Sequence, residues 1–191
     1  MPIVVGGIVK GGVTDNTQTI RSGETEESTI REKGLLMLSH VKGNMDSMPS
    51  LGWGSCHTVY FERPKGEYDL KYVEVFGCRS EVPNNLHKNF ILYILDEKQK
   101  PITRLLYPYE TFELFVKKWV VLPVSVAEVP KKFGVALDFD SESLKNIGVG
   151  VEKTTGETHS KTGKPYQGFQ PWQKGEEWMI RVYLEKVEKK N

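Results

Sequence analysis

From Leu35 onward the chain consists largely of short runs in which apolar and polar residues alternate. Successive side chains of a β-strand point to opposite faces, so a period of two marks a strand with one buried face. Clusters of Gly, Pro, Asn or Asp separate most runs, which is typical of turns between antiparallel strands. We therefore predict an all-β protein, an antiparallel sandwich or jelly roll. The runs are 57–62, 70–77, 89–96, 101–108, 117–126, 132–140, 146–152 and 177–187.

Helices contribute little to this fold: we expect two short ones at most, and only residues 109–118 have helix-like spacing. A bulged strand fits that stretch nearly as well. The apolar positions of the runs predict the core, although Met179 and Val182 differ in parity. Either a bulge interrupts that strand or both of its faces are buried. The predicted core comprises Val59, Phe61, Val73, Val75, Leu92, Ile94, Val120, Leu122, Val135, Leu137, Val149, Val151, Met179 and Val182.

The first 34 residues differ from the rest, which predicts an N-terminal strand and polar arm or loop (1–34) before the sandwich domain (35–191). Residues 14–34 are rich in Thr and Glu and nearly lack large apolar side chains. They therefore cannot bury enough apolar area to offset the conformational entropy that they would lose on becoming ordered. The first positive charge, Lys10, follows the apolar start, the wrong order for a secretory signal peptide. The compartment stays open, with the cytoplasm favoured.

Charge and composition narrow the class of protein. Lys plus Arg (26) and Asp plus Glu (25) nearly cancel, which argues against a nucleic-acid partner. No apolar run approaches the roughly 20 residues of a membrane-spanning helix, so we expect no membrane insertion. The 8 Phe, 8 Tyr and 4 Trp argue against disorder.

The two cysteines give a geometric prediction. If 57–62 and 70–77 form a hairpin, pairing Val59 with Val75 places Cys56 opposite Cys78. Cross-strand Cβ atoms come within about 4.5–5.5 Å, slightly longer than a disulfide prefers. A strained Cys56–Cys78 disulfide and two free thiols therefore both remain open.

Catalytic motifs are absent from the sequence, and its four histidines lack metal-binding spacing. We expect no cofactor and no resident metal. The carboxylates Asp138, Asp140 and Glu142 alternate just past a strand and are weak candidates for Ca²⁺. A strand end that turns into solvent is the simpler interpretation. His57 opens a strand and is expected inside or at the rim of the core.

Aromatic residues in connecting segments are the most suggestive feature. Such residues can form a platform for a sugar or a partner side chain, or they can plug the ends of the sandwich. His159, in a loop rich in Gly, Thr and Lys, could add a hydrogen bond. We expect the Pro- and Gly-rich segment 165–175 to be a loop. The predicted ligand-binding residues are Trp53, Tyr107, Tyr109, His159, Tyr166 and Trp172.

Residues 40–185 resemble a bacterial and archaeal β-sandwich module of unknown function. That module is found at the C-terminus of antibiotic-sensor-type membrane peptidases and of some sigma-factor-like proteins. The segments that carry the resemblance are 56–79, 90–102, 133–152 and 176–185, with the spacing of His57, Phe61 and Pro64 as the most specific part together with WMIRV at 178–182. The chain also looks distantly like galactose-binding or discoidin-type jelly rolls. The resemblance implies no catalytic residue.

Three functions follow as hypotheses. The first is a non-catalytic module that recognises a saccharide or protein partner through its aromatic-bearing loops. The second is a hydrolase with a carboxylate pair, since Asp138 and Asp140 share one strand face by parity. The third is a structural or interaction domain whose arm, 14–34, docks on a partner.

Overall fold

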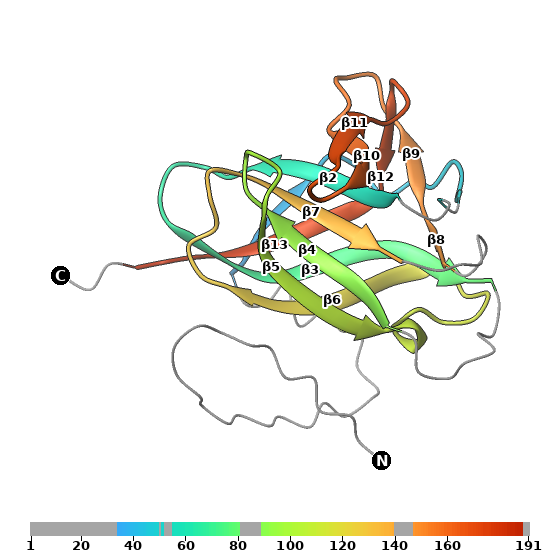
Figure 1. Ribbon diagram of the computed structural model, residues 1–191, viewed down its shortest axis with the longest axis horizontal. Coiled ribbons are helices and arrows are strands. Elements are labelled where there is room, and N and C mark those ends of the chain that lie inside the picture. Colours follow the sequence, from blue (N-terminus) through green and yellow to red (C-terminus); the bar gives the residue numbers. More distant parts are fainter. Residues whose placement is uncertain (1–33, 50, 52–54, 81–88, 140–146, 189–191) are drawn as a thin grey trace, which may run out of the picture.

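The chain folds into a two-layered β-sandwich (Figure 1), which confirms the predicted all-β antiparallel fold. The computed structural model describes residues 34–49, 51, 55–80, 89–139 and 147–188. Within these ranges the helical part is a single 3₁₀ turn, Tyr109–Thr111, inside the stretch with helix-like spacing. No helix in the described ranges is long and apolar enough to cross a membrane. The predicted arm, apart from Gly34, lies outside these residues, and so its role stays a prediction.

Two sheets and a short ribbon make up the sandwich, and every strand pair is antiparallel. The first sheet has the order β1 (Leu36–Ser39), β13 (Ile180–Lys186), β3 (Tyr68–Arg79) and β6 (Lys118–Val126), with β8 (Ile147–Val149) paired to β3. The second sheet has the order β11 (Gly168–Pro171), β10 (Ser160–Lys164), β2 (Cys56–Glu62), β7 (Lys132–Asp138), β4 (Asn89–Leu95) and β5 (Pro101–Pro108). The ribbon pairs β9 (Val151–Lys153) with β12 (Glu176–Trp178).

All the predicted core residues are buried. The parity conflict at the end of the chain is resolved by a break at Met179, which separates β12 from β13. Ile180 and Val182 belong to the main core cluster, whereas Met179 packs on the other side against Gly150. A Cβ at Gly150 would lie 2.7 Å from the Met179 sulfur and 2.9 Å from the Phe76 ring, so a larger residue would force these side chains to move. Both sides of the chain are buried here, and alternation resumes after the break.

The expected hairpin of 57–62 and 70–77 is wrong, because β2 and β3 belong to different sheets. β2 pairs with β7 and β10, while β3 pairs with β13, β6 and β8. The chain crosses between the layers at residues 63–67, where the Arg63 guanidinium donates to the carbonyls of Val129 and Gly66. The two apolar faces therefore meet across the core instead of lying side by side.

The same correction decides between the two alternatives left open for the cysteines, a strained Cys56–Cys78 disulfide and two thiols. Cys56 and Cys78 are both buried, and no disulfide joins them. The Cys78 thiol lies 3.5 Å from the sulfur of Met48, and Cys56 packs with a small cluster on the outer side of the second sheet.

Candidate functional site

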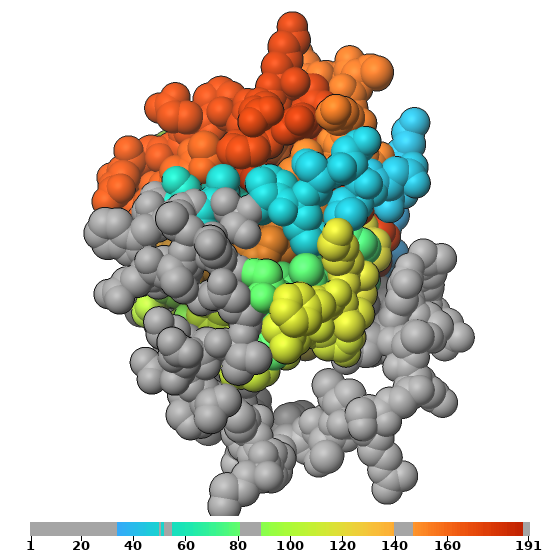
Figure 2. Space-filling model, turned by 90° about the vertical axis from the view of Figure 1, so that its right-hand side faces the viewer, coloured from blue at the N-terminus to red at the C-terminus, as the bar shows by residue number. Residues whose placement is uncertain are grey.

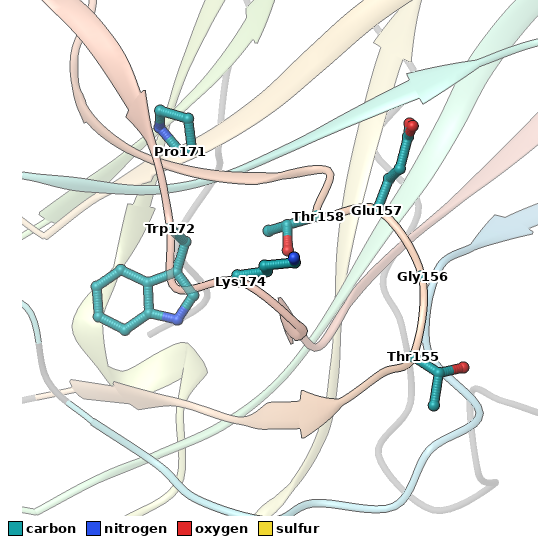
Figure 3. A pocket seen from close by; sticks show the side chains of 7 residues that line it. All are labelled: Thr155, Gly156, Glu157, Thr158, Pro171, Trp172 and Lys174. Atoms are coloured by element: carbon teal, nitrogen blue, oxygen red, sulfur yellow. The ribbon is translucent and has the colours of Figure 1, made fainter.

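A pocket of about 580 Å³ lies at one end of the sandwich, between the loop that follows β9 and the loop that follows β11 (Figure 3). This is a suitable size for a small ligand. One aromatic side chain, a lysine, a carboxylate and two threonine hydroxyls are available in it. The lining residues are Thr155, Gly156, Glu157, Thr158, Pro171, Trp172 and Lys174.

Trp172 is half-buried and fixed from several directions. Its indole packs against the fully buried indole of Trp178, with ring centroids 4.4 Å apart. Its backbone N–H donates to the carbonyl of Ser160 at 2.9 Å, and its Nε1–H donates to Glu176 at 3.2 Å. Trp178 is fixed in turn, because its Nε1–H donates to the carbonyl of Lys161 at 3.2 Å. Trp172 is therefore a rigid wall of the pocket.

The two loops that form the pocket are joined through Thr158. Its Oγ1 accepts a hydrogen bond from the backbone N–H of Gly175 at 3.0 Å and donates to the carbonyl of Gln173 at 3.4 Å. The N–H of Thr154 donates to the carbonyl of Gly175 at 2.8 Å. Gly175 has a φ of +76°, a left-handed conformation that glycine adopts without steric cost. These bonds hold the pocket walls at a fixed separation.

Behind the pocket, a buried carboxylate organises the start of β10. The Oε1 of Glu177 accepts from the backbone N–H of His159 at 2.6 Å and lies 3.0 Å from its Nδ1. The Oε2 of Glu177 accepts from the Ser160 hydroxyl at 2.5 Å, and that hydroxyl accepts from the N–H of Trp178 at 2.8 Å. The serine thus bonds to the glutamate and not to the imidazole, so this cluster lacks the serine–histidine bond of an activated nucleophile.

A pair of stacked imidazoles joins this cluster to the segment that follows β1. The rings of His40 and His159 are parallel within 3° with centroids 3.7 Å apart. The Nε2 of His40 lies 2.8 Å from the carbonyl of Tyr60. Burial lowers the pKa of His40, and the neighbouring His159 acts in the same direction. His40 is therefore held as the neutral imidazole at neutral pH.

Residues 40–47, which we call the strap, are held by a second buried carboxylate. Glu152 accepts hydrogen bonds from the backbone N–H groups of Lys42 at 3.0 Å, Gly43 at 2.7 Å and Asn44 at 2.9 Å. Asp46 accepts from the N–H of Lys153 at 2.7 Å. Because three successive N–H groups converge on one carboxylate, the strap is tied to β9, which leads into the pocket loop.

Of the predicted ligand-binding residues that the structure describes, Trp172 lines the pocket and the others do not. His159 is next to Thr158 in the chain, but its ring stacks on His40. Tyr166 is 85% exposed on the turn between β10 and β11, away from the lining residues. Trp53 lies outside the described residues.

The structure buries Tyr107 and Tyr109, so their prediction as ligand-binding residues is wrong. Their hydroxyls donate to the carbonyls of Pro123 and Phe139, and their rings pack against Phe90. These tyrosines plug one end of the sandwich. The segment 165–175 is also not all loop, because Gly168–Pro171 forms β11.

The candidate carboxylates cannot be compared as a set, since Asp140 and Glu142 lie outside the described residues. Asp138 is buried, with the Lys164 ammonium at 3.8 Å. The calcium site and the carboxylate-pair hydrolase therefore stay predictions. Among the described residues no group of three or more His, Cys, Asp or Glu could hold a metal ion.

His57 is buried in the core, as expected, with ring edges against Phe139 and Trp178. Burial lowers the pKa of His57 to about 3, against a smaller raising effect of the Pro49 carbonyl. The unfolded chain, with a histidine pKa near 6.5, takes up the proton first as the pH falls. Burial of neutral His57 therefore does not lower the free energy of unfolding above about pH 6.5. Below that pH the free energy of unfolding falls progressively, because the unfolded chain binds a proton that the folded chain does not.

We expect this loss to be visible in the difference between wild type and His57→Phe. Between pH 6.5 and 5, acidification should destabilise wild type more than the variant, with a difference in slope that rises from about 0.7 to about 1.3 kcal/mol per pH unit. Urea unfolding at several pH values measures the two slopes, and the subtraction removes the contribution of His40. Parallel pH profiles for the two proteins would show that His57 is not held neutral.

Comparisons with models of protein families, with curated proteins and with solved structures found no match to this chain. The site is therefore defined by its own geometry. Sequence reasoning missed Glu177 and Glu152, because an isolated glutamate in an alternating strand is expected to point to solvent. It also missed the threonines of residues 154–158, because threonine is common in exposed loops and gives no sign of a binding site there.

Proposed function

We propose that the protein is a non-catalytic module that binds a saccharide in the pocket beside Trp172. The observation that carries the proposal is the fixed indole of Trp172, which forms the aromatic wall of a pocket that also presents Thr155, Glu157 and Lys174. Sugars present both an apolar C–H face and hydroxyl groups. An aromatic ring suits the former, and directional hydrogen-bonding side chains suit the latter.

Three features of the pocket support this class of ligand. Thr155, Glu157 and Lys174 supply acceptors and donors in addition to the threonine that braces the loops. The walls are held by hydrogen bonds, so little conformational entropy is lost when a ligand binds. The sequence resemblance to galactose-binding-like jelly rolls agrees with a saccharide ligand. The proposal therefore includes a relationship of this chain to those jelly rolls.

The direct test is Trp172→Ala, with Tyr166→Ala as a matched control from the same hairpin. Loss of the aromatic wall should weaken saccharide binding at least tenfold, about 1.4 kcal/mol. The control removes an aromatic ring that is 85% exposed outside the pocket and should leave affinity unchanged. Binding is measured by calorimetry on the saccharides that a glycan-array screen of wild type selects, and folding by circular dichroism.

Equal affinities of wild type and a folded Trp172→Ala variant would contradict the proposal. Unfolding of that variant would instead assign Trp172 to the core, because the indole also packs on Trp178. In that event Lys174→Ala, which removes an exposed side chain of the same pocket, decides whether the pocket binds sugar.

One observation favours a second function, an interaction domain. Phe115 is 70% exposed and has a φ of +59°, a conformation that costs a bulky residue about 1–2 kcal/mol. Its neighbour Val116 is 46% exposed, and their segment, yellow in Figure 2, lies on an open face of the molecule. A protein partner with an apolar pocket would cover these side chains. If wild type and the Phe115→Ser variant bind the same protein partner equally well, this surface is not the binding site and this function is contradicted.

A further inference from the structure

The outer face of the second sheet carries a continuous row of cross-strand neighbours that begins at the pocket. Lys161 pairs with the pocket residue Pro171 on one side and with Thr58 on the other. Thr58 pairs with Ala136, Ala136 with Tyr93, and Tyr93 with Arg104. Directly opposed residues of antiparallel strands share a face. The row therefore crosses all six strands of this sheet on the side away from the core.

Small residues in the middle of the row let aromatic rings lie against the sheet. Thr58 and Ala136 are fully buried beneath their neighbours. A Cβ at Gly134 would lie 2.9–3.3 Å from three carbons of the Tyr60 ring, so that ring lies across the glycine. The Lys161 ammonium lies over the same ring, 4.7 Å from its centroid. We call Lys161, Tyr60, Tyr93 and Arg104 the cationic strip.

The strip carries two cations, Lys161 and Arg104, with two carboxylates close by: in addition to burial, the charge of Asp96 raises the pKa of Tyr60 and that of Asp138 raises the pKa of Tyr93. Lys161 and Arg104 form no ion pair with a carboxylate among the described residues. The one buried carboxylate beside the strip, Asp138, faces the Lys164 ammonium at 3.8 Å. Arg104 is exposed at the edge strand β5, and Lys161 is half-buried next to the pocket. Two cations separated by aromatic rings thus lie along one path that ends at Pro171.

We propose that the ligand is a linear anionic polysaccharide, of which one unit occupies the Trp172 pocket and the following units run along the cationic strip. This inference rests on the proposed function and specifies its substrate class. Strands lie about 4.8 Å apart, so the row from Pro171 to Arg104 spans roughly 24 Å. That length exceeds a single sugar and suits a chain. Carboxylates on the chain would meet Lys161 and Arg104, and a sugar face would lie on the Tyr93 ring, since Lys161 already covers the Tyr60 ring.

The test compares oligogalacturonates of increasing length with the same oligosaccharides after methyl esterification, which removes the charge and keeps the sugar. Wild type should bind the free acids more tightly, with affinity that rises with chain length until the strip is covered. The double variant Lys161→Gln/Arg104→Gln should lose about tenfold or more toward the longer acids and nothing toward the esters. Lys118→Gln, on the edge of the first sheet, is the control and should match wild type.

Two results would overturn the inference and leave the proposed function standing. One is equal affinity for acids and esters with no effect of the double variant, while Trp172→Ala still removes binding. The other is tighter binding of the acids than of the esters that the double variant Lys161→Gln/Arg104→Gln retains in full. Equal, strip-dependent binding of poly-glutamate would overturn it in favour of an acidic peptide. Failure of wild type to bind any sugar, acid or ester, would overturn the inference and the proposed function together.

Discussion

Replacing Phe61 with alanine should lower the free energy of unfolding by about 3–5 kcal/mol. Phe61 is 2% exposed in the main core cluster, with its ring 5.8 Å from that of Phe133. On its other side the ring stacks on His40 at 5.2 Å. The change removes a large buried side chain and leaves a cavity between the second sheet and the strap. Urea unfolding monitored by circular dichroism measures the loss.

Phe115→Ala removes the same side chain from an exposed position and serves as the control. It should change stability by less than about 0.5 kcal/mol, since Phe115 is 70% exposed. If Phe61→Ala lowers the free energy of unfolding as little as Phe115→Ala does, Phe61 is not a core residue and the inner face assigned to β2 is wrong.

Glu152→Ala should cost about 3 kcal/mol, because the backbone N–H groups of Lys42, Gly43 and Asn44 lose their acceptor together. Each buried donor left without a partner costs about 1–3 kcal/mol, and water entering the surface strap recovers part of that. We also expect the strap to detach from β9. Hydrogen exchange at residues 42–44 should then accelerate in the native state, before global unfolding.

Glu152→Gln retains one acceptor oxygen and should lie between wild type and Glu152→Ala. Glu97→Ala removes a carboxylate from an exposed turn and should be neutral. If the slow exchange of residues 42–44 persists in Glu152→Ala, another group holds the strap and the assigned role of this carboxylate is incorrect.

The alternation of apolar and polar residues was sufficient to predict the core and the fold class, because it indicates which side of each strand is buried. It does not state which strand lies beside which. Val59 and Val75 both face the core, and that pattern fits a hairpin as well as two strands in opposite layers. The crossing at residues 63–67 depends on contacts of Arg63 with Val129, which is distant in sequence. The incorrect hairpin, on which the possible Cys56–Cys78 disulfide depended, has this one cause.

The candidate site was partly predictable for a related reason. Aromatic residues in Pro- and Gly-rich segments include both core plugs and exposed rings, and local sequence does not separate them. Tyr107 and Tyr109 turn inward because the carbonyls of Pro123 and Phe139 accept their hydroxyl protons. Trp172 remains at the surface because Trp178 already fills the space beneath it. These differences arise from tertiary contacts alone.

The most direct test of the account is the indole N–H signal of Trp172 in a ¹⁵N-labelled protein titrated with the saccharides that wild type selects. The signal is assigned with Trp172→Phe, and Trp119, on the edge strand β6 of the first sheet, provides an internal reference. The account predicts a saturable shift of the Trp172 signal at ligand concentrations where the Trp119 signal stays in place. Binding of these saccharides without a change at Trp172, or with equal changes at Trp172 and Trp119, would contradict it.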